Sequence, residues 1–300
     1  MATVKKKIAP VEGEVSVADA LHFAAVADEI MRRPATASAG AITPDAPHIG
    51  TLREKRLHAV LKHYLCADES CHERLIEVSD PATITADGTA VGTAIGRVRH
   101  PVADILTGGE IIEVQTGTLY PLRDKIAWYF QNTDCRVTVV HPIPAVKYVS
   151  WIDPKSGDIL SRNRAPKRGR VKDVAREMYW LSDFVGDPRF SLRVMLLEIE
   201  EYRMADGWGR DGKRGSNRYE RFPTTLKGDV TLTGPTDYAT YFLPDTLREE
   251  GKIFTAAEYA TAVGLRGRVV YGMLHLLEKL GLVRMTDEMR GRARTYTVVS

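Results

Sequence analysis

The sequence of 300 residues has little of what secreted, membrane or disulfide-rich proteins need. Its three cysteines cannot build a disulfide framework, which fits a reducing compartment. No apolar run approaches the length of a membrane span, and the basic start is followed by Pro10, Glu12 and Glu14 instead of the apolar core of a signal peptide. A net charge of +3 is too small to identify a partner. We therefore expect a soluble cytoplasmic protein with no membrane partner.

The composition is that of an ordinary globular protein, with 44% hydrophobic and 27% charged residues. This length suits two domains or one large domain with an appendage. We predict an N-terminal arm and linker over residues 1–47, a main domain over 48–235 and a C-terminal domain over 236–300. The arm contains a predicted helix over 17–33, and its Pro- and Ala-rich end is expected to be partly mobile.

The main domain is organised around residues 102–115. Apolar and β-branched residues on both sides of the Gly-Gly pair at 108–109 predict a hairpin of two short strands. Because side chains alternate along a strand, Glu113 and Gln115 would share one face, and Asp104 would lie on the neighbouring strand. Two carboxylates and an amide on one side of a small sheet could hold a divalent metal against a phosphate.

The segments around this hairpin alternate between helix and strand patterns. Residues 51–65 form a predicted amphipathic helix, and Glu54 projects close to its apolar stripe. A carboxylate there needs a partner or a metal, although a helix-start Glu stabilised by the helix dipole is an equal alternative. The further predicted elements are strands over 72–78, 91–105, 110–116 and 135–143, with a helix over 119–130 before the last of them.

Four potential zinc ligands lie near the end of the first helix of this domain. These are His63, Cys66, Cys71 and His72. Their spacing differs from the tight ligand spacing of structural zinc sites, and we therefore do not predict zinc here.

The order helix, three strands, helix, strand, with Asp104 on the second strand and a Glu113-x-Gln115 motif on the third, resembles the core of the PD-(D/E)xK nuclease superfamily. The resemblance covers residues 49 to 143 and implies an α/β fold, restriction-endonuclease-like, with an αβββαβ core and extensions. It implies that Asp104 and Glu113 bind Mg²⁺, or Mn²⁺, with the carbonyl of Val114 as a further ligand. Glu54 would support the site from the first helix.

Gln115 stands where this superfamily usually has a lysine. Some restriction endonucleases carry Glu-x-Gln at this place and cut DNA. The resemblance therefore implies that Gln115 positions the attacking water, and that Asp104, Glu113, Gln115 and Glu54 form the catalytic set.

Two basic stretches follow the predicted core. Both contain glycine and lie close to aromatic residues, as expected of segments that contact a phosphate backbone, although a charge run is more often a solvated surface. The candidate nucleic-acid-binding residues are Arg164, Lys167, Arg168 and Arg170 in the first stretch and Arg210, Lys213 and Arg214 in the second.

The C-terminal residues from about 238 resemble a winged helix-turn-helix domain. Thr255 and Glu258 form a capping box before a short helix, a longer helix covers 266–280, and a hairpin ends the chain. Such domains bind DNA or serve as protein-interaction modules. The basic residues here favour DNA, and the predicted contacts are Arg266, Arg268, Arg290 and Arg292.

Together these features predict a Mg²⁺-dependent DNA endonuclease directed to its target by a winged helix domain. The alternative is a catalytically inactive DNA-binding or regulatory protein on a nuclease fold, which the departure at Gln115 keeps open. An enzyme acting on RNA or on branched DNA also stays open. The sequence does not determine the target, the cutting pattern, the biological pathway or the oligomeric state, a homodimer included.

Overall fold

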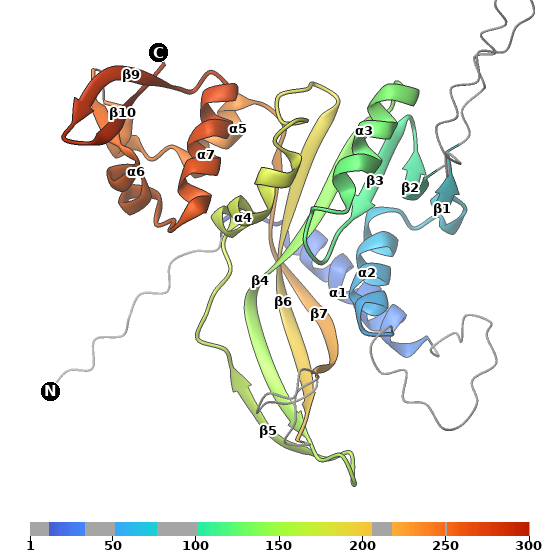
Figure 1. The fold of residues 1–300 in the computed structure, drawn as a ribbon. Coiled ribbons are helices and arrows are strands. Elements are labelled where there is room, and N and C mark those ends of the chain that lie inside the picture. The colour runs from blue at the N-terminus through green and yellow to red at the C-terminus, as the bar shows by residue number, and fades with distance from the viewer. Residues whose placement is uncertain (1–11, 34–51, 77–100, 206–217, 250, 300) are drawn as a thin grey trace, which may run out of the picture.

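The computed structural model describes residues 12–33, 52–76, 101–205, 218–249 and 251–299, and for residues 52–55, 218 and 219 only the backbone. Its helices cover both faces of one mixed sheet, so the protein belongs to the α/β class (Figure 1). The elements up to the middle of the chain are α1 (Val17–Arg32), α2 (Leu52–Leu65), β1 (His72–Leu75), β2 (Val102–Thr107), β3 (Glu110–Val114), α3 (Leu122–Asn132) and β4 (Arg136–Ile152). The rest are β5 (Ile159–Arg164), α4 (Ala175–Met178), β6 (Phe190–Met204), β7 (Arg218–Leu232), α5 (Pro235–Phe242), β8 (Ile253–Thr255), α6 (Ala256–Val263), α7 (Arg268–Lys279), β9 (Val283–Arg290) and β10 (Ala293–Val298), with short 3₁₀ turns at Glu69–Cys71, Val171–Val174, Tyr179–Leu181 and Asp245–Leu247.

The main sheet has the strand order β1-β2-β3-β4-β6-β7, and β5 pairs with the second half of β4. The pairs β1–β2, β2–β3 and β6–β7 are antiparallel, whereas β3–β4 and β4–β6 are parallel. The predicted hairpin between β2 and β3 is confirmed. Gly108 and Gly109 form its turn with φ of 55° and 77°, a left-handed conformation that suits a two-residue hairpin and that other residues rarely adopt.

Alternation along β3 sends side chains to two separate apolar layers. Ile112 and Val114 belong to the layer under α1 and α2, and Ile111 belongs to the layer that includes α3. Glu113 shares the side of Ile111, because its carboxylate contacts α3. The sheet therefore directs Glu113 towards α3.

Helix α1 lies against this sheet, which corrects one prediction. Residues 1–47 were expected to form a peripheral arm, and this is wrong for the described residues 12–33, because α1 packs on α2 and β7. Phe23, Ala27 and Ile30 are buried there. The helix itself was predicted correctly, and the Ser16 side chain caps it by accepting the Asp19 N–H. Its burial depends on residues far along the chain, which the local pattern does not show. The predicted linker lies outside the described residues.

Strands β4, β6 and β7 are long, and they extend past the part of the sheet that the helices cover to form an arm (Figure 1). The predicted strand over 135–143 is therefore only the first half of β4. Strand β5 is added to the edge of this arm, and all six of its residues are exposed.

The C-terminal unit comprises α5 to β10 and has the order helix, strand, two helices and two strands. The capping box at Thr255 and Glu258 is confirmed. Its apolar core is continuous with the layer that includes α3, α4 and the main sheet. Two lysines connect the units, since Lys172 donates to the Val263 carbonyl at 2.6 Å and Lys279 donates to the Ser182 carbonyl at 2.6 Å. No helix in the described segments combines the length and the apolar character needed to cross a membrane.

Candidate functional site

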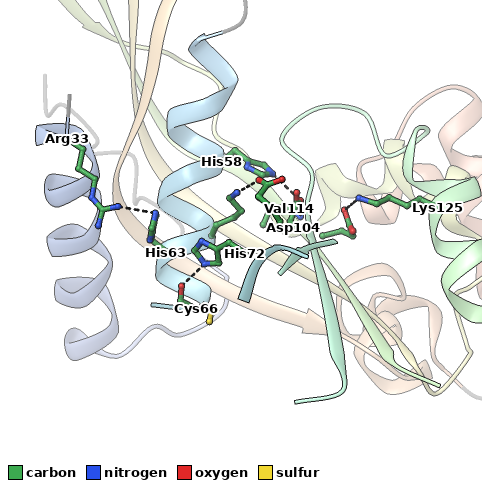
Figure 2. A network of polar contacts seen from close by, with 11 residues as sticks. Arg33, His58, His63, Cys66, His72, Asp104, Val114 and Lys125 are labelled. Atoms are coloured by element: carbon green, nitrogen blue, oxygen red, sulfur yellow. Dashed lines mark hydrogen bonds and ion pairs between the residues drawn. The ribbon is translucent and has the colours of Figure 1, made fainter. Parts of the chain in front are cut away.

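Asp104 lies where β2 and β3 diverge. The last register pair at this end of the hairpin joins Ile105 and Ile112. Beyond this pair, Oδ2 of Asp104 accepts a hydrogen bond from the Val114 N–H at 2.8 Å. This side-chain contact takes the place of a backbone hydrogen bond between the two strands. The same oxygen lies 3.1 Å from Nε2 of His58 on α2, as Figure 2 shows. The aspartate carboxylate is therefore held between a helix and a strand end.

Glu113 is buried in the neighbouring strand, with 2% of its surface exposed. Its Oε2 accepts a hydrogen bond from Nζ of Lys125 at 2.7 Å, and its Oε1 accepts one from the Tyr129 hydroxyl at 2.7 Å. Lys125 and Tyr129 are four residues apart on α3 and so lie on the same face of that helix. Figure 2 labels Lys125 and marks its contact with a dashed line. Helix α3 thus supplies both partners of the glutamate.

The surroundings shift the pKa values of the two carboxyl groups in opposite directions. Burial raises the pKa of Glu113 above its ordinary value, and repulsion by Asp104 adds to this, while Lys125 and Tyr129 act against it. Burial also acts to raise the pKa of Asp104, but the hydrogen bond and charge of His58 and the Val114 N–H outweigh it, so this pKa is lowered. Asp104 is therefore ionised at neutral pH, whereas ionisation of Glu113 in the folded protein costs more free energy than ionisation of an exposed glutamate.

We expect Glu113→Gln to stabilise the fold at pH 8. A raised folded-state pKa means that the folded protein binds this proton more tightly than the unfolded chain. Stability therefore falls as the pH rises from about 4.3, the unfolded value, through the folded-state pKa. Glutamine removes this penalty and still accepts hydrogen bonds. Thermal melts from pH 3 to pH 8 should show a higher Tm for the variant at pH 8, and a gap that closes as the pH falls through the folded-state pKa.

Asp104→Asn is expected to have the opposite effect. Its pKa is lowered in the folded state, so the charged carboxylate contributes stability above about pH 3.9 that is lost as the pH falls through the folded-state value. Loss of this charged hydrogen-bond acceptor should lower stability at pH 8 by about 1–2 kcal/mol. The same melts measure it. Shifts of equal sign in the two variants would contradict the assignment of the two environments.

Gln115 follows the end of β3, and its side chain is engaged by its own loop. Nε2 donates to the Thr118 carbonyl at 2.6 Å, and the Gln115 carbonyl accepts a hydrogen bond from Nδ1 of His141 at 2.8 Å. Glu177 of α4 holds the same loop by accepting from the Thr118 hydroxyl and the Leu119 N–H. The sequence prediction that this amide positions a water molecule stays untested, but in this structure its donor nitrogen is occupied.

Three residues of the site were not predicted from the sequence, namely His58, Lys125 and Tyr129. His58 lies one turn after Glu54 on α2, and it contacts Asp104. The side chain of Glu54 itself is outside the described atoms, so its role stays a prediction. Lys125 and Tyr129 lie in the segment 119–130, for which the sequence predicted only a helix. The available signal was their spacing, since they place two polar groups on one side of α3 at i and i+4.

The donor atoms of the site are those that Mg²⁺ prefers. Asp104 and Glu113 contribute carboxylate oxygens. The N–H and C=O of one strand residue point to the same side of the strand, so the Val114 carbonyl faces the Asp104 side as its N–H does. Within the described residues no group of three or more His, Cys, Asp or Glu side chains forms a metal site. A pair of carboxylates completed by water and phosphate oxygens suits Mg²⁺, which commonly binds through one or two carboxylates.

The cysteine and histidine residues after α2 form a separate polar cluster. The rings of His63 and His72 meet edge to face with centroids 4.9 Å apart, and Nε2 of His72 lies 2.9 Å from the Cys66 carbonyl. Nε2 of His72 is thus engaged by the backbone.

The predicted nucleic-acid-binding residues have different surroundings. Arg164, Lys167, Arg168 and Arg170 are all exposed, and no ion pair of their side chains occurs within the described residues. By contrast, Arg162 in the same stretch pairs with Glu200 and lies 3.8 Å from the Tyr148 ring centroid. The second basic stretch, with Arg210, Lys213 and Arg214, lies outside the described residues.

In the C-terminal unit, Arg266, Arg268 and Arg292 are exposed. Arg290 is half-exposed but engaged, because Nη1 contacts Oε1 of Glu258 at 2.7 Å and Nη2 donates to the Ile253 carbonyl at 2.7 Å. This arginine supports the capping box of α6, and that contact competes with any contact to DNA.

These observations define an α/β protein with a mixed sheet and a pair of carboxylates at the end of one hairpin. Residues 93–233 match a family described as a domain of unknown function, DUF8091. An uncharacterized protein of Treponema pallidum (strain Nichols) is 25% identical over 173 residues, which is 58% of this chain, and the chain spans 57% of that relative's length. No solved structure matches the chain. The family match includes Asp104, Glu113 and Lys125, but neither His58 nor the C-terminal unit.

Proposed function

We propose that this protein is a Mg²⁺-dependent endonuclease that hydrolyses phosphodiester bonds in DNA. The observation that carries the proposal is the electrostatic proximity of two carboxylates at the end of the β2–β3 pairing, since the charge of Asp104 raises the pKa of Glu113 and the charge of Lys125 lowers the pKa of both. The element order α2-β1-β2-β3-α3-β4, with an antiparallel hairpin followed by a parallel strand, supports a restriction-endonuclease-like core. The order and capping of α5 to β10 support a winged helix-turn-helix unit.

The proposed ligands of Mg²⁺, or Mn²⁺, are Asp104, Glu113 and the carbonyl of Val114. When bound, the ion supplies positive charge to the scissile phosphate and lowers the pKa of the attacking water. His58 keeps the Asp104 carboxylate in place through the contact at 3.1 Å. Tyr129 does the same for Glu113 through its hydroxyl. Glu54 stays a proposed supporting residue.

Lys125 is proposed for the part that the superfamily usually gives to a lysine on the strand. Its ammonium group lies 2.7 Å from Oε2 of Glu113, so it brings a positive charge to one of the proposed metal ligands. A fixed cation beside the phosphate stabilises the negative charge that develops during hydrolysis. Gln115 stands at the strand position but donates to Thr118. A lysine from α3 would therefore replace the charge that the strand lacks.

The proposal is tested by incubating the full chain with supercoiled plasmid and with circular single-stranded DNA. Mg²⁺ or Mn²⁺ should give nicked or linear products, and EDTA should prevent them. Equilibrium dialysis with Mn²⁺ alone measures metal binding in the same preparation. Absence of cleavage with either ion, on either DNA, would overturn the proposed activity.

The exposed basic segment after β5 is proposed to contact the phosphate backbone. Replacing Lys167, Arg168 and Arg170 together by glutamine should weaken DNA binding and reduce the slope of log K against log salt by about one for each phosphate that is no longer neutralised. Arg290→Gln is a matched control, because Arg290 is already paired with Glu258. It should lower thermal stability and leave the salt slope unchanged. Fluorescence anisotropy at several salt concentrations gives both slopes, and an unchanged slope in the triple variant would exclude this mode of DNA binding.

A second candidate function is a DNA-binding regulator that does not cleave. The observation that favours it is that both oxygens of Glu113 already have partners, Lys125 and Tyr129, which would also suit a purely structural ion pair. Metal binding separates the two candidates. A regulator of this kind should bind DNA equally well with and without Mg²⁺, and show no Mn²⁺ binding in dialysis.

A further inference from the structure

Two exposed tyrosines, Tyr120 and Tyr179, lie along one seam of the described chain. Their exposed fractions are 57% and 62%. Trp180 joins the two, because its ring centroid lies 4.8 Å from that of Tyr120 and 5.4 Å from that of Tyr179. A Cβ placed on Gly272 would lie 3.8 Å from a Tyr179 ring carbon, so α7 packs against this seam at Gly272.

The seam runs from the carboxylate site to the C-terminal unit. Tyr120 lies between the loop after β3 and the start of α3, the helix that carries Lys125. Glu177 fixes that loop by accepting from Thr118 and Leu119. Figure 1 shows α4, which leads into Tyr179 and Trp180, between α7 and the β3–α3 segment. The rings are therefore held on short, fixed elements beside the site.

The ring geometry leaves aromatic faces open. Both pairs are edge to face, with interplanar angles of 70° for Tyr120–Trp180 and 73° for Tyr179–Trp180. In such an arrangement the edge of one ring covers one face of the other, and the exposed fractions of Tyr120 and Tyr179 leave ring surface on which a planar ligand can stack.

The charge along the seam favours an anionic ligand. Arg176 and Arg268 are exposed, and within the described residues their side chains have no ion pair. Of the acidic groups near these rings, Asp183 is neutralised by Arg123 at 3.0 Å, whereas Glu177 accepts two hydrogen bonds from neutral donors and keeps its charge, which leaves the two arginines in excess over it. Planar faces beside unpaired arginines match bases joined by phosphates.

We propose that Tyr120, Trp180 and Tyr179 stack with unpaired bases of a single-stranded nucleic acid and lead that strand to the carboxylate site. The inference rests on the proposed function for its substrate class, since the strand would be the one that is cleaved. Stacking is tolerant of sequence because every base has a π face. The substrate class is therefore single-stranded DNA, or DNA with an unpaired branch, and not a uniform duplex.

The test measures binding of the full chain in EDTA, so that cleavage does not enter. Fluorescein-labelled single strands and the matched duplex are titrated by anisotropy. Tyr179→Ala and Tyr120→Ala should each bind the single strand about 5- to 100-fold more weakly, which is the range for loss of one stacked base. Tyr179→Phe and Tyr120→Phe keep the ring and should bind within about twofold of the parent. Leu21→Ala, at an exposed apolar residue of α1, is the control for a remote surface change.

A second measurement reports stacking directly. Single-stranded DNA should quench part of the tryptophan emission, and Trp180→Phe should remove that part although three other tryptophans remain. Equal affinity for single strand and duplex, alanine variants that bind like the parent, or quenching unchanged in Trp180→Phe would each overturn the inference. The inference would also be overturned if the protein bound no single strand and Tyr179→Ala changed the self-association of the protein in sedimentation. That result would assign the seam to a contact between protein molecules. If the protein cleaves DNA but the alanine variants bind the single strand like the parent, only the stacking inference is overturned. If the rings stack with DNA but the protein does not cleave it, only the nuclease proposal is overturned.

Discussion

Asp104→Asn and Glu113→Gln are each expected to lower Mg²⁺-dependent cleavage by about a thousandfold, the upper end of the range for loss of one preorganised group in an active site. Both substitutions keep the size of the side chain and remove its charge, so the two proposed metal ligands are weakened without a large change in packing. Single-turnover cleavage of plasmid at saturating Mg²⁺ measures the loss, and Mn²⁺ dialysis should show weaker binding in both variants.

Glu110→Gln is the matched control for this experiment. Glu110 lies on the same strand, β3, but its Oε1 accepts a hydrogen bond from the Thr138 hydroxyl, away from Asp104 and Lys125. Its substitution should leave cleavage within a few-fold of the parent. Because Glu113→Gln is also expected to raise the Tm, loss of activity in that variant would not be explained by unfolding. Parental cleavage rates in Asp104→Asn and Glu113→Gln would exclude the carboxylate pair as the active site.

Lys125→Met is expected to lower the cleavage rate by about a hundredfold, since it removes one fixed positive charge while it keeps a long apolar stem. Gln115→Ala should have a much smaller effect, because the Gln115 amide nitrogen is bonded to Thr118. This order reverses the expectation from the sequence, which gave the water-positioning role to Gln115. The two variants are compared in single-turnover experiments with equal Mg²⁺, after thermal melts show that both are folded.

The comparison also includes Lys125→Arg. Arginine keeps the charge and the contact with Glu113 but places it differently, so an intermediate rate is expected. A large loss in Gln115→Ala together with a parental rate in Lys125→Met would return the role to Gln115. If Gln115→Lys cleaves where the parent does not, the natural site is inactive, and the DNA-binding regulator becomes the better description.

Much of the fold follows from short stretches of the sequence. The hairpin at Gly108 and Gly109, the capping box at Thr255 and Glu258 and the helix after Ser16 are each determined by residues a few positions apart. Their local conformations do not depend on the rest of the chain, because turn, cap and periodicity signals act within one or two turns of backbone. The order of helices and strands along the chain around Asp104 and Glu113 was predicted from local signals of the same kind.

The partners of the charged groups could not be predicted in this way. Arg162 belongs to a basic run in the sequence, yet Glu200 comes from a strand that is distant along the chain and neutralises it. Helix α1 was expected on the periphery, and the sheet buries it. In both cases the deciding contact joins residues that are far apart in the sequence, so no window of the sequence contains it.

The sequence by itself determined that an aspartate and a glutamate stand on the two strands of one hairpin, because strand alternation and a Gly-Gly turn are local properties. Only the tertiary structure decided that Lys125 and Tyr129 of α3 bind Glu113 and that His58 of α2 contacts Asp104. The physical reason is that a buried carboxylate takes whichever donor the packing of helices on the sheet brings within hydrogen-bond distance.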